Sequence, residues 1–155
     1  MPEPKIRLTN IGITFRPRER EPVVAVQNIS LAVRDGSIVT VVGPSGCGKS
    51  TILNAVSGLL MPSSGHAEID GQRVTGIRHD VGYMFARDGM MPWRTAISNV
   101  EFGLEVRGVA NRHEVARDWL RKGGLEKFAG HYRHELSQGM RQRVAVARTF
   151  AIDPD

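Results

Sequence analysis

The strongest chemical signal in the sequence is a glycine-rich segment of the kind that holds the phosphates of ATP or GTP. Its members are Gly43, Pro44, Ser45, Gly46, Cys47, Gly48, Lys49, Ser50 and Thr51. They fit the pattern G-x-x-x-x-G-K-[ST]. The apolar residues 37–42 before the segment predict a buried strand, and residues 50–56 predict the start of a helix. Because a chance glycine-rich turn rarely has both flanks, we interpret the segment as a nucleotide-binding loop.

The residue types explain how such a loop would bind an anion. Inward backbone N–H groups and a helix N-terminus carry partial positive charge, and Lys49 adds a full one. Gly46 and Gly48 can adopt positive φ, which lets the backbone approach phosphate closely. Ser50 is placed to give a hydroxyl oxygen to Mg²⁺, so ATP and Mg²⁺ are the expected cofactors. We interpret Cys47 as a small filler rather than a nucleophile.

A second helix N-terminus is predicted at residues 136–148, where a hydroxyl residue and a glycine open a run of basic and apolar residues. Ser137 could donate from its hydroxyl to an anion, and Gly139 would let a ligand approach the backbone. Taken alone, the pattern fits a capped amphipathic helix better than a binding site. Its presence downstream of a phosphate loop reverses that preference.

Bulk composition is that of an ordinary globular protein. The chain has 155 residues, 41% of them hydrophobic and 24% charged, which is enough for a real core. No apolar run is long enough for a membrane-spanning helix, and the start lacks the apolar stretch of a signal peptide. The single cysteine excludes an internal disulfide. The net charge of +5 is scattered, so we expect solvated faces and no nucleic-acid partner.

Hydrophobic periodicity divides the chain into a β-rich part and a helical part. Alternating apolar residues predict strands over residues 5–14, with a slip near Asn10, and over 24–33, and Asp70-Gly71 predicts a hairpin turn. Residues 81–85 predict a short strand. Helical spacing predicts helices over about residues 95–108, 111–122 and 138–152, the first with Val106 on its apolar stripe and the second capped by Asn111. The prediction is an α/β nucleotide-binding domain: a β-rich part at about residues 1–85 and a helical insert at about 86–152.

In this order, the two motifs resemble those of the ATP-binding subunits of ABC transporters. The phosphate loop looks like their Walker A motif. Ser137, Gln138, Gly139 and Met140, after Leu136, look like their signature, usually written LSGGQ. This form, followed by Arg-Gln-Arg-Val, is similar to the branch that serves nitrate, sulfonate and taurine importers, as are residues 87–95 and 99–104. The resemblance covers residues 8–155.

The resemblance implies a P-loop ABC-type fold with an N-terminal antiparallel β part, a phosphate-loop core and a helical insert. Two subunits would meet head to tail, so that each ATP lies between one Walker A motif and the partner's signature helix. Lys49 would contact the β- and γ-phosphates and Ser50 the Mg²⁺. Phe15 lies where the family stacks an aromatic ring on adenine, although a core role fits it equally well. Trp93 lies in a region expected near the membrane subunit, with simple packing as the equal alternative.

The family also implies partners and a location. A homodimer of ATP-binding subunits would drive two membrane permease subunits and, indirectly, a periplasmic solute-binding protein. The expected position is peripheral, on the cytoplasmic face of a bacterial inner membrane.

Three departures from the family pattern affect these expectations. Ala86 stands where the family has a glutamine that touches Mg²⁺, and Asp88 is a candidate substitute. Gln138 replaces the first glycine of the signature. Asp153-Pro154-Asp155 ends the sequence where the family continues with an apolar strand that carries the catalytic glutamate. We therefore expect a C-terminally truncated domain that hydrolyses ATP negligibly alone and tends to aggregate.

Two alternatives remain open at this point. The first is a non-catalytic module that binds nucleotide, or pairs with a full-length partner, without turnover. The second is a nucleic-acid-linked ABC ATPase. The compact spacing between the phosphate loop and the signature argues against it, since such proteins carry long insertions there. A small GTPase or a nucleotide kinase would explain the loop but not the signature helix.

Overall fold

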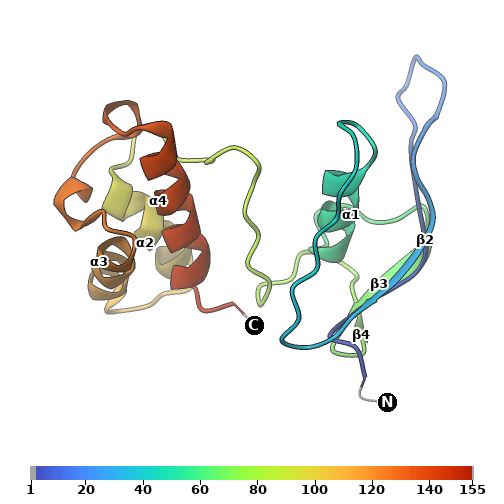
Figure 1. Ribbon diagram of the computed structural model, residues 1–155, viewed down its shortest axis with the longest axis horizontal. Helices are drawn as coiled ribbons and strands as arrows, with labels where there is room; N and C mark the ends of the chain where they lie inside the picture. Colours follow the sequence, from blue (N-terminus) through green and yellow to red (C-terminus); the bar gives the residue numbers. More distant parts are fainter. Residues whose placement is uncertain (1–2, 155) are drawn as a thin grey trace. The chain divides into compact units, whose positions relative to one another are not determined.

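The computed structural model describes residues 3–154, which divide into two compact units, Met1–Arg78 and His79–Asp155 (Figure 1). The first unit contains the sheet and the phosphate loop. The second unit is helical and contains the signature residues.

The sheet of the first unit has four antiparallel strands in the order β2-β1-β3-β4. Their bounds are β1 (Ile6–Phe15), β2 (Val23–Val33), β3 (Ser64–Ile69) and β4 (Gln72–Arg73). The central strand β1 buries Leu8, Ile11 and Ile13. Its register shifts between Leu8 and Ile11. Asn10 has a φ of 49° at this irregularity, so the slip predicted near Asn10 is confirmed.

Helix α1 (Lys49–Val56) contacts three of these strands and buries Ala55. It begins within one residue of the helix start predicted from residues 50–56. The β3–β4 turn is also confirmed, because Asp70 and Gly71 have φ values of 51° and 70°, as a two-residue hairpin turn requires.

Two predicted strands, residues 37–42 and residues 81–85, do not form within the described chain. A strand satisfies its backbone groups by pairing with neighbours, and the ladders among residues 3–154 include neither segment. The side chains are correspondingly open to solvent: Ile38 is 96% exposed and Val42 86% exposed. The two segments are apolar, as the sequence shows, but the prediction that residues 37–42 form a buried strand is wrong. A strand becomes buried only when neighbouring strands pair with it.

The second unit packs three helices, α2 (Ala96–Val106), α3 (Arg112–Lys122) and α4 (Gln138–Ala151), around one core. Two short 3₁₀ turns, η1 (Glu126–Phe128) and η2 (Arg133–Glu135), connect α3 to α4. The apolar faces predicted for these helices supply most of the buried side chains. The core residues are Met90, Ala96, Val100, Leu104, Ala116, Leu120, Leu125, Leu136, Val144, Ala147 and Ala151.

Two local predictions in the helical unit are wrong. Asn111 occupies the N-cap position of α3 but has a φ of −91° and makes no side-chain cap hydrogen bond. Val106, the last residue of α2, is 73% exposed and does not join the helical core.

Candidate functional site

The phosphate loop leads directly into the N-terminus of α1, and that terminus is open to an anion. Gly48 is the N-cap residue with a φ of 94°, and no side chain caps the helix. The first turn contains no acidic residue. Gly46 also has positive φ, at 82°, so both glycine predictions are confirmed. The partial positive charge of the helix end is therefore not neutralised locally by a carboxylate in its first turn.

The Lys49 ammonium lies over the loop rather than away from it. Its Nζ donates to the carbonyl oxygens of Gly43 at 2.8 Å and Pro44 at 2.7 Å, and lies 3.6 Å from Cys47 Sγ. Bound phosphate would exchange these carbonyl contacts for charged oxygens, which form stronger hydrogen bonds with an ammonium. The Lys49 ammonium is therefore held at the glycine-rich loop, where the sequence predicts that phosphate binds.

The Ser50 position suits one magnesium ligand and no more. Its side chain is exposed in the first turn of α1, next to Lys49. A hydroxyl oxygen is a ligand type that Mg²⁺ accepts, usually together with phosphate oxygens, waters and carboxylates. Among residues 3–154 there is no cluster of three or more acidic, histidine or cysteine side chains able to hold a metal.

Close packing ties the phosphate loop to one end of the sheet. A Cβ added to Gly48 would lie 2.7 Å from the carbonyl oxygen of Ala25 on β2, so glycine is needed there for contact as well as for φ. Two residues before Ala25, Val23 pairs with Phe15 at the end of β1. Phe15 is 44% exposed, which disfavours the core alternative and leaves its ring accessible at the end of the sheet that carries the loop.

The signature residues form the exposed N-terminal tip of α4. Ser137 is the N-cap residue, and its hydroxyl accepts a hydrogen bond from the Met140 N–H at 3.3 Å. That hydroxyl keeps its own hydrogen for donation. Gly139 is exposed, and a Cβ there would meet nothing within 4 Å. The first turn of α4 has no acidic residue, so this tip also suits an anion.

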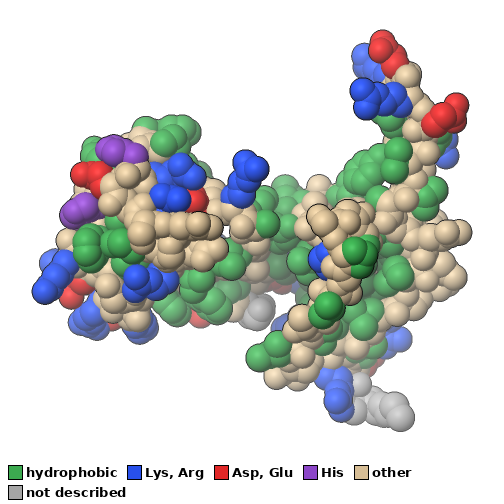
Figure 2. All heavy atoms as spheres, turned by 45° about the horizontal axis from the view of Figure 1, so that its top comes forward, with side chains coloured by type: hydrophobic (Ala, Val, Ile, Leu, Met, Phe, Trp, Pro, Cys, Tyr) green, Lys and Arg blue, Asp and Glu red, His purple; other side chains and the backbone are tan. Residues whose placement is uncertain are grey.

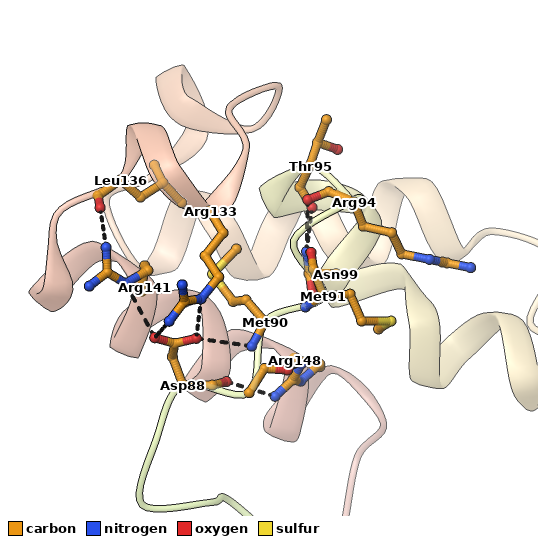
Figure 3. Close-up of polar contacts among 11 residues, drawn as sticks. Asp88, Met90, Met91, Arg94, Thr95, Asn99, Arg133, Leu136, Arg141 and Arg148 are labelled. Atoms are coloured by element: carbon orange, nitrogen blue, oxygen red, sulfur yellow. Dashed lines mark hydrogen bonds and ion pairs between the residues drawn. The ribbon is translucent and has the colours of Figure 1, made fainter.

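Asp88 is not the substitute magnesium ligand that the sequence suggested. Its side chain is only 9% exposed and accepts hydrogen bonds from the Arg133 and Arg141 guanidinium groups and the Met90 N–H (Figure 3). Burial alone would raise the pKa of Asp88, but these donors together lower it below its usual value. The carboxylate is committed to protein contacts and is not free for a metal.

Asn99 organises the residues before α2 and was missed by the sequence reasoning. It is completely buried, and its Oδ1 accepts from the Met91 N–H at 2.8 Å. Its Nδ2 lies 3.2, 3.0 and 2.9 Å from the carbonyl oxygens of Met91, Arg94 and Thr95. The available signal was an amide adjoining Val100 on an apolar helix face. Trp93, within the loop so fixed, is 73% exposed, so the packing alternative for it is wrong.

Charged side chains gather at the projecting tip between β1 and β2, and hydrophobic side chains remain visible on the sheet-containing unit (Figure 2). Within residues 3–154, none of the helices is both long and apolar enough to cross a membrane.

An antiparallel sheet, a phosphate loop opening a helix and a helical unit with a capped, exposed tip together define a P-loop nucleotide-binding domain of the ABC type.

The chain belongs to the ABC transporter family, whose model matches residues 26–155. It is 46% identical over 153 residues to an uncharacterized ABC transporter ATP-binding protein of Methanocaldococcus jannaschii, covering 97% of this chain and 57% of that protein. Taurine import ATP-binding proteins TauB are also similar. The protein of Yersinia pestis is 44% identical over 132 residues, covering 84% of this chain and 52% of its own length. That of Burkholderia pseudomallei is 43% identical over 152 residues, covering 97% and 58%.

Solved structures support the same fold. The dimeric ATP-binding cassette MJ0796, in a post-hydrolysis state bound to ADP and Pi, superposes with a TM-score of 0.85 and 33% identity. The match covers 96% of this chain and 70% of that one. The chain spans somewhat more than half the length of the curated relatives it matches.

Proposed function

We propose that this chain is part of the ATP-binding subunit of an ABC importer, in which ATP binding and hydrolysis power uptake of a small solute such as taurine, another sulfonate or nitrate. The observation that carries the proposal is the pair of anion-ready helix tips. The tip of α1 has Lys49 held over its loop, and the tip of α4 is exposed and free of acidic residues. The similarity to TauB proteins supports taurine as the first solute to test.

In the proposed mechanism each ATP is bound by two copies of the subunit. Lys49 and the loop amides hold the β- and γ-phosphates, while Ser50 contributes one oxygen to Mg²⁺. The α4 tip of the second copy, with Ser137 and Gly139, faces the same triphosphate. Phe15 is the proposed adenine contact. In this proposal ATP binding closes the homodimer, because each ATP is contacted by both copies.

The proposed membrane partner contacts the surface near Trp93. Trp93 and Phe102 are 73% and 39% exposed, and the Arg94 guanidinium lies 5.1 Å above the Phe102 ring. Exposed aromatic side chains next to a fixed cation are typical of protein interfaces. The permease subunits would place the protein on the cytoplasmic face of the inner membrane, with a periplasmic solute-binding protein acting indirectly and no role for nucleic acid.

The test is titration of the complete gene product with a fluorescent ATP analogue. Lys49→Ala should weaken binding by about tenfold or more, since it removes a charge-assisted hydrogen bond worth more than about 1.4 kcal/mol. Lys122→Ala is the matched control, because Lys122 pairs with Asp118 in the helical unit. Equal affinities for the two variants would refute the site assignment.

A measurement of ATP turnover then distinguishes an importer subunit from a non-catalytic module. The module is favoured by one observation: Ala86 stands where the family has a glutamine that touches Mg²⁺. ATP hydrolysis by the subunit with its permease partners in lipid vesicles should rise when taurine and its binding protein are added. Binding without hydrolysis under these conditions would favour the module.

A further inference from the structure

We propose that Asp88 is a positioning residue that fixes the tip of α4 to the loop at residues 86–91, so that movement of this loop moves Ser137 and Gly139. The inference rests on the proposed function, because it assigns Asp88 a role in how that tip meets ATP bound to the second copy. The Asp88 carboxylate is buried and takes no direct part in the proposed phosphate site, and the inference assigns it a structural role.

The Asp88 carboxylate joins two separate stretches of chain through both of its oxygens (Figure 3). Oδ1 accepts from Arg133 Nε at 3.1 Å and from the Met90 N–H at 3.0 Å. Oδ2 accepts from Arg133 Nη2 at 3.3 Å and from Arg141 Nε at 3.2 Å. A two-point contact with a planar guanidinium fixes direction as well as distance.

Arg141 passes this constraint to the signature residues. It lies in the first turns of α4, and its Nη1 donates to the carbonyl oxygen of Leu136 at 2.7 Å. Leu136 is buried and directly precedes Ser137. The same guanidinium therefore holds Asp88 at one edge and the residue before the N-cap at the other.

Arg148 fixes the loop to α4 at a second point, about two turns further along the helix. Its Nη2 donates to the Asp88 carbonyl oxygen at 2.9 Å, and its Nη1 donates to the Gly89 carbonyl oxygen at 2.8 Å. The loop is thus attached to α4 at Arg141 and at Arg148, and two attachment points prevent the loop from rotating about either one alone. Met90 is buried in the helical core and the Met91 backbone is bound by Asn99, so the far end of the loop is also held.

The structure thus makes residues 88–91 an integral part of the helical unit. Ala86 and Arg87 come just before it, and Ala86 is exposed. Residues 86–87 are therefore connected to the α4 tip by the hydrogen bonds from Arg141 to the Asp88 carboxylate and to the Leu136 carbonyl oxygen.

The experiment compares Asp88→Asn with Asp118→Asn in the complete gene product. The control is the same substitution in the same unit, at an aspartate whose ion pairs with Arg121 and Lys122 are exposed. Affinity for a fluorescent ATP analogue is measured first, and ATP-driven dimerisation is measured by light scattering. Asp88→Asn should keep nucleotide affinity within about twofold but weaken dimerisation by about tenfold or more, and Asp88→Glu should restore part of it.

The outcomes separate the inference from the function on which it rests. If Asp88→Asn dimerises like Asp118→Asn, or loses nucleotide affinity to the same extent as dimerisation, the positioning role is wrong. If the unsubstituted protein neither binds ATP nor dimerises with it, the proposed function is wrong instead. Should Asp88→Asn fail to fold, Arg133→Lys replaces it, because lysine keeps the charge at this partly buried position but loses the two-point contact. It must show the same selective loss of dimerisation.

Discussion

Replacement of Asn99 by alanine should destabilise the helical unit severely, because the buried amide holds the chain between Met91 and Thr95. The substitution leaves the Met91 N–H and the Arg94 carbonyl oxygen without their side-chain partner, whereas the Thr95 carbonyl oxygen keeps the backbone N–H of residue 99 as a donor. A buried polar group without a partner costs about 1–3 kcal/mol, and water can reach the half-buried Met91, so we expect a loss of about 3 kcal/mol in the free energy of unfolding.

Tryptophan fluorescence in urea measures this change selectively. The two tryptophans, Trp93 and Trp119, both lie in the helical unit. With an m-value near 1 kcal/mol/M for so small a unit, a loss of about 3 kcal/mol lowers the midpoint by about 3 M. Asn111→Ala is the matched control, because Asn111 is exposed and makes no cap hydrogen bond, and it should cost less than about 0.5 kcal/mol. Equal midpoints for the two alanine variants would refute this reasoning.

Three further predictions concern other parts of the molecule. Gly58→Ala should unfold much of the first unit by circular dichroism, because its Cβ would lie 1.8 Å from the Gly76 carbonyl oxygen. Gly36→Ala, also at positive φ but with nothing within 4 Å, should cost only about 1 kcal/mol. Because the pKa of Asp88 is lowered by folding, its contribution to stability is present above a pH of about 3.8 and is lost as pH falls through the folded pKa. The urea midpoint should therefore fall less steeply in Asp88→Asn than in the unsubstituted protein as the pH is lowered from about 5 to about 3. An equal slope in the two proteins would contradict the contribution of ionised Asp88 to stability. Ala86→Gln, at an exposed position, should raise the ATPase rate of the complete protein, because it restores the glutamine that contacts Mg²⁺ in the family. If neither the rate nor the Mg²⁺ affinity rises, a Mg²⁺-contacting role for a glutamine at this position is contradicted.

Features decided by neighbouring residues could be predicted from the sequence. The positive φ values of Gly46 and Gly48, the Asp70-Gly71 turn and the Ser137 cap each depend on a few adjacent residues, and the structure confirms them. The helical core was predictable for the same reason, because Val144 and Ala147 repeat at helical spacing.

Features decided by distant partners could not be predicted. The strand expected at residues 37–42 lacks a paired neighbour within the described chain, so its apolar side chains stay exposed. Asp88 bonds to residues 45, 53 and 60 positions away in the sequence, and no local pattern indicates that convergence. Asn99 is similar, since its burial follows from how the loop before α2 folds over it.

The most direct measurement of the shared ATP site is ATP-driven dimerisation of the complete subunit carrying Gly139→Asp. The substitution fits the fold, because nothing lies within 4 Å of the added Cβ and an acid suits a helix N-terminus. It also places a negative charge where the partner's triphosphate is proposed to lie. We expect this variant to bind the nucleotide normally through its own phosphate loop and to remain monomeric. Dimerisation as strong as that of the unsubstituted protein would contradict a site formed by the α4 tip in trans.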